Sequence, residues 1–406
     1  MITQPLAGIR VADFTWIGAG SFTTKLLADF GADVIKIESG DRLDSLRISR
    51  PFKDGLEGVN RSGYFADRNS SKRSITLNMK HKRGQELARA LIAKSDVISN
   101  NFTPGTMEKF GLGYEAVREI RPDIVYLAMS MQGASGPEYK YLGYGLTIGA
   151  LTGLQYLSGE PDREPAGTGT NYSDHIPNPC HAAFATLAAL HWRSRTGAGQ
   201  YIDMAQTEPT VALLGPTMLD FTANGREGGR TGNDRAHAYP HGVLRCAGDD
   251  MWIAISVASS SQWQGVVDVL GGPSWMSDPV LQDLNARRAR SAEIDLVLNE
   301  LAKVREADKL MEALQARGVP AGTVRSAKDI IENDPQLRHR KHWVTLDHPE
   351  MGPSIYNAPP FRMTGVKETP HSPAPLLGEH TDSVLRDLLG IEEADIEALR
   401  NDGALR

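Results

Sequence analysis

The first third of the chain alternates between two hydrophobic periodicities. Short apolar runs typical of strands lie at 8–14, 32–38, 74–79, 96–100 and 124–128. Apolar residues at helical spacing lie between them, at 21–30, 83–94 and 106–120. Strands that alternate with helices of this length are typical of βαβ units and a mostly parallel sheet. We therefore expect an α/β fold with a Rossmann-like sheet.

The middle of the chain has a different pattern. Residues 130–177 are rich in Gly, Tyr, Pro and Ser and show weak periodicity, which in a compact domain usually indicates a functional segment. An apolar helix is expected over 181–195, with Asn178 as its N-cap and Pro179 at its first position. A strand at 200–205 follows.

The rest of the chain predicts a second, smaller α+β domain. It combines hairpin strands within 242–257 with helices at 261–270 and 291–315, and two further helices close the tail at 379–389 and 393–400. The predicted boundaries are a large domain made of 1–205 and 345–406, a small domain at 226–330, and linkers at 206–225 and 331–344.

Composition excludes several classes of protein. The 406 residues include 44 Lys+Arg and 50 Asp+Glu, so a net charge of −6 offers no electrostatic footprint for nucleic acid or an anionic membrane. Two cysteines, Cys180 and Cys246, cannot build a disulfide framework. No signal peptide and no apolar run of membrane-spanning length is visible. We expect a cytoplasmic protein with neither nucleic-acid nor membrane partners.

The first strand-to-helix turn carries part of a dinucleotide-binding fingerprint. Gly18 and Gly20 lie in the turn, and Glu38 closes the next strand about 20 residues later, where such an acid binds ribose. Thr23 occupies the position where a third Gly or Ala would allow close packing. NAD or FAD binding, a simple tight turn, and a site for another adenine-bearing ligand remain open.

Two other segments are candidates for chemistry. Asn100–Thr106 joins a strand to a helix, at the sheet edge where α/β proteins bind ligands. Asp174 ends the irregular stretch just before the 181–195 helix, whose N-terminus favours an ionised, nucleophilic carboxylate. His339, His342 and His348 have no metal-pair spacing, so no metal site is expected.

Taken together, six segments in order resemble the class III CoA-transferases, the family of formyl-CoA, carnitine and bile-acid CoA-transferases. The similarity covers nearly the whole chain. The segments are Pro5–Val11, Leu27–Glu38, Asn69–Lys80, Asn101–Gly105, Arg195–Gln200 and Pro375–Thr381.

The resemblance implies specific site residues. Asp174 matches the family nucleophile, and Tyr144 matches a residue of the acyl pocket. The family's contacts with coenzyme A, which is a substrate and not a resident cofactor, fall on Gly18, Ala19, Leu77, Lys80, Asn101, Phe102, Thr106, Lys109 and Lys140.

The resemblance also implies a covalent mechanism and an assembly. CoA moves from an acyl-CoA donor to a carboxylic acid through aspartyl anhydrides and an enzyme–CoA thioester on Asp174. Family members form interlocked homodimers, and some act as two-chain complexes, so a heteromer is the alternative. An NAD- or FAD-dependent oxidoreductase is the alternative function.

Departures from the family pattern bear on the substrate. Thr103 and Ser39 stand where basic residues are frequent, Trp16-Ile17-Gly18 replaces the His-x-Gln of formyl-CoA transferase, and no four-glycine run occurs between 226 and 275. The stretch Gly167–His175 instead looks like the succinyl-CoA-dependent branch, whose members act on dicarboxylates.

Overall fold

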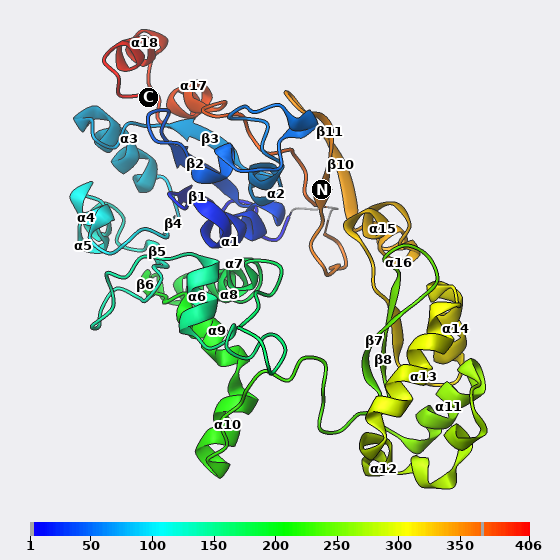
Figure 1. Cartoon of the computed structure of the whole chain (residues 1–406). Coiled ribbons are helices and arrows are strands. Elements are labelled where there is room, and N and C mark those ends of the chain that lie inside the picture. The colour runs from blue at the N-terminus through cyan, green and yellow to red at the C-terminus, as the bar shows by residue number, and fades with distance from the viewer. Residues whose placement is uncertain (1–3, 367–368) are drawn as a thin grey trace. The chain divides into compact units, whose positions relative to one another are not determined.

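The computed structural model describes residues 4–366 and 369–406. The chain forms two compact units (Figure 1). The larger unit comprises Met1–Gln155, Gly167–Glu227 and Gln336–Arg406, and the smaller comprises Tyr156–Ala166 and Gly228–Pro335.

The unit boundaries differ from the predicted domain boundaries in three places, one of which is the expected linker 331–344, divided between the two units after Pro335. Tyr156–Ala166 groups with the smaller unit, where the Gly232 N–H donates to the Gly159 carbonyl at 2.9 Å. The expected linker 206–225 is helical and belongs to the larger unit. The irregular stretch 130–177 therefore contributes to both units.

The larger unit is built on a six-stranded parallel sheet. Its order is β3-β2-β1-β4-β5-β6, so the order reverses between β1 and β4. This is the Rossmann arrangement that the alternating pattern predicted. The strands are β1 Arg10–Asp13, β2 Asp33–Glu38, β3 Arg73–Thr76, β4 Val97–Asn100, β5 Val125–Ala128 and β6 Gln200–Asp203.

Helices and a hairpin complete this unit. The longer helices are α1 Ile17–Asp29, α3 Lys82–Ala93, α8 Pro177–Thr196, α10 Gly215–Asn224 and α18 Glu393–Asn401. The shorter ones are α2 Gly63–Asn69, α4 Thr106–Lys109, α5 Tyr114–Ile120, α6 Gly145–Leu151, α7 Tyr172–His175, α9 Thr207–Leu213, α16 Pro335–His339 and α17 Thr381–Ser383, with the 3-10 helices η1 Ser45–Ile48 and η2 Lys53–Gly55 and the π-helix η5 Val384–Leu388. Strands β10 Trp343–His348 and β11 Gly352–Asn357 form an antiparallel hairpin.

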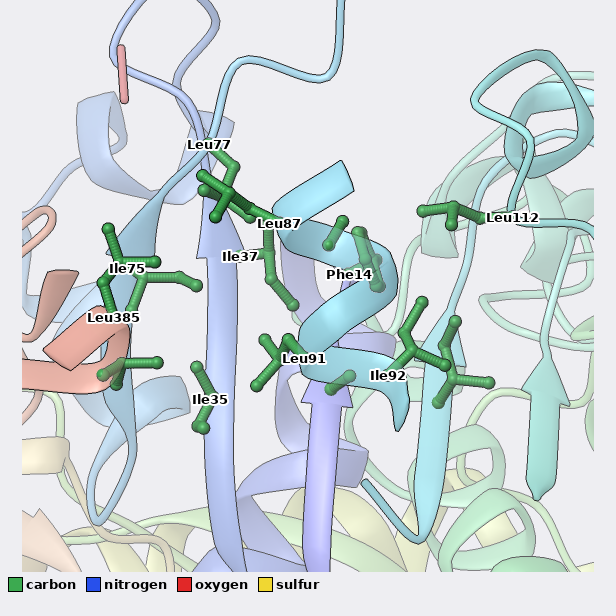
Figure 2. Packing of buried hydrophobic residues seen from close by; sticks show 14 of the residues in the cluster. Phe14, Ile35, Ile37, Ile75, Leu77, Leu87, Leu91, Ile92, Leu112 and Leu385 are labelled. Carbon is green, nitrogen blue, oxygen red and sulfur yellow. The ribbon is translucent and has the colours of Figure 1, made fainter. Parts of the chain in front are cut away.

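Alternation along the strands divides the core into two layers. Val11 and Val34 face one side of the sheet with Ala28 of α1 and Ala189 of α8. The neighbouring positions face the other side, where helix α3 lies across the sheet and Leu87 and Leu91 point toward Ile35 and Ile37 (Figure 2). Leu385, from the C-terminal tail, packs in the same layer. Period-two strands between amphipathic helices thus produce a doubly covered sheet.

Local structure departs from the predicted elements at three points. The helix expected at 106–120 breaks into α4 and α5 around Gly111, whose φ is +69°. Asn178 is not an N-cap, because α8 begins at Pro177 and the Asn178 side chain donates to Gln206 Oε1 at 3.4 Å. Helix α2 was not expected at all.

The smaller unit is the predicted α+β domain. Its antiparallel sheet has the order β7-β8-β9, made of His241–Arg245, Trp252–Ser256 and Ala321–Thr323. A separate apolar core surrounds the fully buried Trp263. The helices are α11 Ser260–Leu270, α12 Leu284–Ala289, α13 Ser291–Lys303, α14 Ala307–Ala316 and α15 Ala327–Glu332, with the 3-10 turns η3 Ser274–Ser277 and η4 Pro279–Gln282.

The described helices do not include a membrane span. Across residues 4–366 and 369–406, none of the helices combines the length and the apolar character that crossing a bilayer requires.

Candidate functional site

A cavity opens where the strand order of the large sheet reverses. The loops after β1 and β4 lie side by side there, and in open parallel sheets this crevice is where ligands bind. The cavity has a volume of about 600 Å³ and lies wholly within the larger unit. Six of the predicted site residues line it: Gly18, Ala19, Asn101, Phe102, Tyr144 and Asp174.

A second cavity of about 270 Å³ adjoins the first. It is mainly apolar, and the predicted contacts Leu77, Lys80 and Thr106 line it. Trp16 and Phe102 line both cavities, with their rings edge to face at 5.7 Å between centroids. The two spaces therefore share an aromatic boundary.

The remaining predicted basic contacts lie outside both cavities. Lys109 and Lys140 are exposed, and the Lys140 ammonium lies 5.2 Å from the ring centroid of Tyr139. Their contact with CoA stays a prediction.

Asp174 occupies a buried position on the short helix α7. Its side chain is only 4% exposed, and Oδ2 accepts a hydrogen bond from the Gly145 N–H at 3.1 Å. Burial raises its pKa to about 6, while the Gly145 N–H and the charge of Arg68 act in the opposite direction. Among the described residues it is the one carboxylate that lines the large cavity.

Two glycines make room for this carboxylate. A Cβ added to Gly145 would lie 2.7 Å from Asp174 Oδ2, and one added to Gly18 would lie 3.2 Å from Asp174 Cβ. A side chain at Gly145 would force Asp174 to move, and one at Gly18 would make a tight contact with Asp174 and Tyr64. Gly18 therefore packs closely on Asp174, and its predicted contact with CoA stays a prediction.

A polar cluster lies next to Asp174. Arg68 Nη2 donates to His175 Nδ1 at 3.0 Å. Because Arg can only donate, this contact assigns the His175 proton to Nε2, which then donates to the Tyr64 hydroxyl at 3.4 Å. Burial, together with the charge of Arg68, lowers the pKa of His175 to about 4, so His175 is neutral at physiological pH.

Polar side chains hold the β1–α1 loop in shape. Asn101 Oδ1 accepts from the Trp16 N–H at 2.8 Å, and its Nδ2 donates to the Trp16 carbonyl at 2.7 Å. Asp44 accepts from the Ile17 N–H, and Ile17 has the unusual φ of 60°. The amide group of Asn101 is therefore engaged with the loop, so the predicted CoA contact of Asn101 would come from its other atoms.

Glu38, the acid of the dinucleotide-binding fingerprint, is not available to bind a ribose. Glu38 is buried, and both of its oxygens are engaged: Arg47 donates to each, at 2.8 and 2.7 Å, and Ser74 donates to Oε2. It forms an internal ion pair instead of presenting a free carboxylate to a ribose. The glycine pair at 18 and 20 is thus left without the acid that the NAD or FAD interpretation requires.

Sequence reasoning missed several residues at the site. Arg42 lines both cavities, and its guanidinium lies 5.3 Å from the Trp16 ring centroid. Tyr64 and Arg68 come from the unexpected helix α2, and Ser130 lines the large cavity after β5. The position of Ser130 at the carboxyl end of a strand is a signal that could have found it.

Metal binding has no candidate in the described part of the chain. There, no group of three or more His, Cys, Asp or Glu side chains is arranged to hold an ion. His348, one of the three histidines noted in the sequence, is buried and accepts from the N–H groups of Glu350 and Met351.

The sequence and the fold together identify the class of protein. The sequence pattern of CoA-transferase family III matches residues 6–381, and the chain belongs to this family. It is therefore a CoA-transferase.

Individual relatives are similar over almost their full length. The succinyl-CoA–L-malate CoA-transferase beta subunit of Chloroflexus aurantiacus is 32% identical, over 98% of each chain. The formyl-CoA:oxalate CoA-transferase of Streptomyces coelicolor is 31% identical over the whole of both chains. The crystal structure of a CAIB/BAIF family protein from Brucella suis has a TM-score of 0.86 at 31% identity, covering 95% of this chain and 100% of that one.

Proposed function

We propose that this CoA-transferase uses Asp174 as its nucleophile and moves CoA from succinyl-CoA to a carboxylic acid. The observation that carries this proposal is the position of Asp174. It is a buried carboxylate at the switch-point cavity, held by one backbone N–H and flanked by two glycines.

The proposed reaction starts with two acyl exchanges. A carboxylate oxygen of Asp174 attacks the donor thioester carbon, the C–S bond breaks, and CoA thiolate leaves behind a mixed anhydride. The thiolate then attacks the aspartyl carbonyl of that anhydride, which releases succinate and forms an Asp174–CoA thioester.

Two further exchanges complete the cycle. The acceptor carboxylate attacks the Asp174–CoA thioester and expels CoA thiolate, forming a second anhydride. Thiolate attack on the acceptor's acyl carbon then gives the new acyl-CoA and restores Asp174. Splitting the transfer in this way replaces one difficult step with easier ones.

The surroundings of Asp174 support this chemistry. The Gly145 N–H fixes one carboxylate oxygen and stays in place as charge develops on the aspartyl group. At the N-terminus of α1, Asp44 accepts from the Ile17 N–H, but the N-cap residue Trp16 makes no side-chain cap hydrogen bond. The next N–H groups, those of Gly18 and Ala19, are the proposed donors to an oxyanion or a phosphate. Burial limits the access of water to the reactive anhydride.

For CoA, we propose that the adenine occupies the smaller, apolar cavity and the pantetheine arm passes the Trp16–Phe102 boundary toward Asp174. Lys80 and Arg42 line that cavity and provide positive charge for the phosphates. Arg42 would then supply the charge that Ser39 lacks. Lys109 and Lys140 would act from the exposed rim.

Succinyl-CoA is proposed as donor on the basis of the Gly167–His175 stretch and of the departures from the formyl-CoA transferase pattern. The Chloroflexus relative, whose name includes succinyl-CoA and L-malate, adds to this argument. A dicarboxylic acid is the proposed class of acceptor.

For assembly, we propose an interlocked homodimer in the cytoplasm. Helix α10 buries none of its residues within the chain, and Leu219 and Phe221 on it are 67% and 55% exposed. Phe184 on α8 is 73% exposed. A second copy is the proposed cover for these apolar side chains, and a two-chain complex is the alternative, since the Chloroflexus relative is named as a beta subunit.

The nucleophile can be tested by substitution. Asp174→Asn removes the charge and Asp174→Glu moves the carboxylate by one methylene, so both should lose nearly all succinyl-CoA-dependent transfer while CoA still binds. The exposed Asp162→Asn is the matched control and should keep full activity. Substantial transfer by Asp174→Asn, with deamidation excluded by mass spectrometry, would refute the proposal.

A further inference from the structure

Ser130 lies at the carboxyl end of the sheet, inside the large cavity. It follows β5, and its carbonyl accepts from the N–H of Gln206, which follows β6, at 3.0 Å. The Thr207 N–H in turn donates to the Met131 carbonyl at 3.1 Å. Two backbone hydrogen bonds between neighbouring segments therefore hold Ser130 firmly in the cavity wall.

The hydroxyl of Ser130 is buried but unpaired. The residue is 6% exposed, and its Oγ has no hydrogen-bond partner among residues 4–366 and 369–406. Of the buried side-chain atoms in that state, it is the one that belongs to a residue lining the large cavity. A buried hydroxyl without a partner is costly, and such exceptions call for an explanation.

The neighbouring amide does not compete for this hydroxyl. Gln206 Nε2 donates to the Met129 carbonyl at 2.7 Å, and Gln206 Oε1 accepts from Asn178. The Ser130 hydroxyl thus has a donor and an acceptor that no group among the described residues uses, on a residue that lines the cavity.

The position of Ser130 indicates which part of the substrate it meets. The residues shared with the smaller cavity are Trp16, Arg42, Phe102 and Thr103, and this is the side where CoA is proposed to enter. Ser130 lines the large cavity but not the smaller one, and it is buried, as Asp174 is. In the proposed mechanism the acyl carbon must approach the Asp174 carboxylate.

We propose that the Ser130 hydroxyl hydrogen-bonds an oxygen carried by the acyl chain, and so selects acyl groups with a carboxylate or hydroxyl substituent. This inference rests on the proposed role of Asp174, which places the acyl group in this cavity. Arg42, the one Lys or Arg side chain among the described residues that line the cavity, lies on the shared side. The selection at the buried end is therefore made by a neutral group.

The test compares three donors of equal chain length in the wild type and in Ser130→Ala. Succinyl-CoA carries a carboxylate, 3-hydroxybutyryl-CoA a hydroxyl, and butyryl-CoA neither. The ratio of kcat/KM for an oxygen-bearing donor to that for butyryl-CoA should fall about tenfold in Ser130→Ala, the usual effect of losing one such hydrogen bond. Whether the ratio falls for succinyl-CoA or for 3-hydroxybutyryl-CoA identifies the oxygen that Ser130 recognises.

Ser99→Ala is the matched control. Ser99 lies on the adjacent strand β4, is 1% exposed, and also has an Oγ without a partner among the described residues, but it does not line the cavity. Its substitution should leave all three kcat/KM values unchanged. The milder Ser130→Cys, which keeps a weak donor, should give a ratio between those of the wild type and Ser130→Ala.

Two results would overturn the proposal. Unchanged kcat/KM ratios in Ser130→Ala would show that the hydroxyl does not bind the acyl chain. An equal loss of kcat/KM with all three donors would indicate that it binds the pantetheine arm instead. These results are distinguishable from a failure of the proposed role of Asp174. That role is tested separately, because an active Asp174→Asn would refute the mechanism whatever the donor preference of Ser130→Ala.

Discussion

At the scale of single residues, the site depends on a carboxylate kept in an unfavourable environment. Burial raises the pKa of Asp174 to about 6, and the charge of Arg68 partly offsets that effect. Tyr64 and His175 are its other titratable neighbours, and both stay neutral near pH 7 because burial raises the pKa of Tyr64 and lowers that of His175. A buried carboxylate is less solvated, and therefore more reactive once ionised.

The pH dependence of transfer should report this environment. Asp174 must be ionised to attack, so kcat/KM should fall as the pH drops through about 6. In Arg68→Gln the lost charge should raise the pKa of Asp174 and move this acid limb to higher pH. Arg68→Lys keeps the charge and should leave the limb near its wild-type position.

The quantity to compare is the pH at which kcat/KM falls on the acid side of each pH profile. Arg68 also holds His175, so the absolute rate of Arg68→Gln can fall for positional reasons. An acid limb at the same pH in Arg68→Gln and the wild type would contradict the role given to the Arg68 charge.

At the scale of elements, the start of helix α6 packs against Asp174, the proposed nucleophile. Gly145 is the first residue of α6 and has no space for a Cβ beside Asp174 Oδ2. Gly145→Ala should therefore displace the carboxylate and reduce kcat by at least about a hundredfold, the scale of loss expected when reacting groups are misplaced by an ångström.

Gly215 provides the control for that substitution. It is also the first residue of a helix, α10, and a Cβ there would meet nothing within 4 Å. Although α10 is proposed to face a second copy, one added methyl group suits an apolar surface, so Gly215→Ala should keep wild-type kcat and stability. If Gly145→Ala were equally active, with its fold verified by circular dichroism, the close packing of Gly145 on Asp174 would have no catalytic meaning.

The helices and strands differ in how far they could be predicted from the sequence. The strands of the large sheet and helices such as α3 follow from hydrophobic periodicity, because burial on defined faces imposes it. Helix α2 could not be found in this way, since its short, polar sequence derives its stability from tertiary contacts such as the Phe65 packing. Tyr64 and Arg68 were missed with it.

Sequence motifs do not show which contacts a side chain makes in the folded protein. Glu38 fits a fingerprint in spacing, but only the three-dimensional structure shows that Arg47 and Ser74 engage its carboxylate. Asp174, which matches the family nucleophile and ends an irregular Gly-rich stretch, lines the large cavity, and its role as nucleophile stays a prediction. The unpaired hydroxyl of Ser130 is a property of packing, which no linear pattern encodes.

At the scale of the whole molecule, the exposed apolar helices bear on assembly. A homodimer covering α8 and α10 should give a dimeric mass by light scattering at low micromolar concentration. Replacing Leu219 and Phe221 with Asp should shift the mass toward the monomer, since charges at an apolar interface are costly to bury. Val304→Asp, at an exposed position of the smaller unit, should remain dimeric. A monomeric, fully active wild type would rule out the proposed assembly.

In the proposed mechanism, the acyl group and CoA are each bonded covalently to Asp174 in turn. The most direct measurement is peptide mass spectrometry of the protein after incubation with succinyl-CoA, followed by rapid acid quenching. We expect a succinyl or CoA adduct on the peptide that contains Asp174, which hydroxylamine converts to a hydroxamate and which Asp174→Asn lacks. An unmodified Asp174 peptide in the turning-over wild type, or an adduct on another carboxylate, would contradict it.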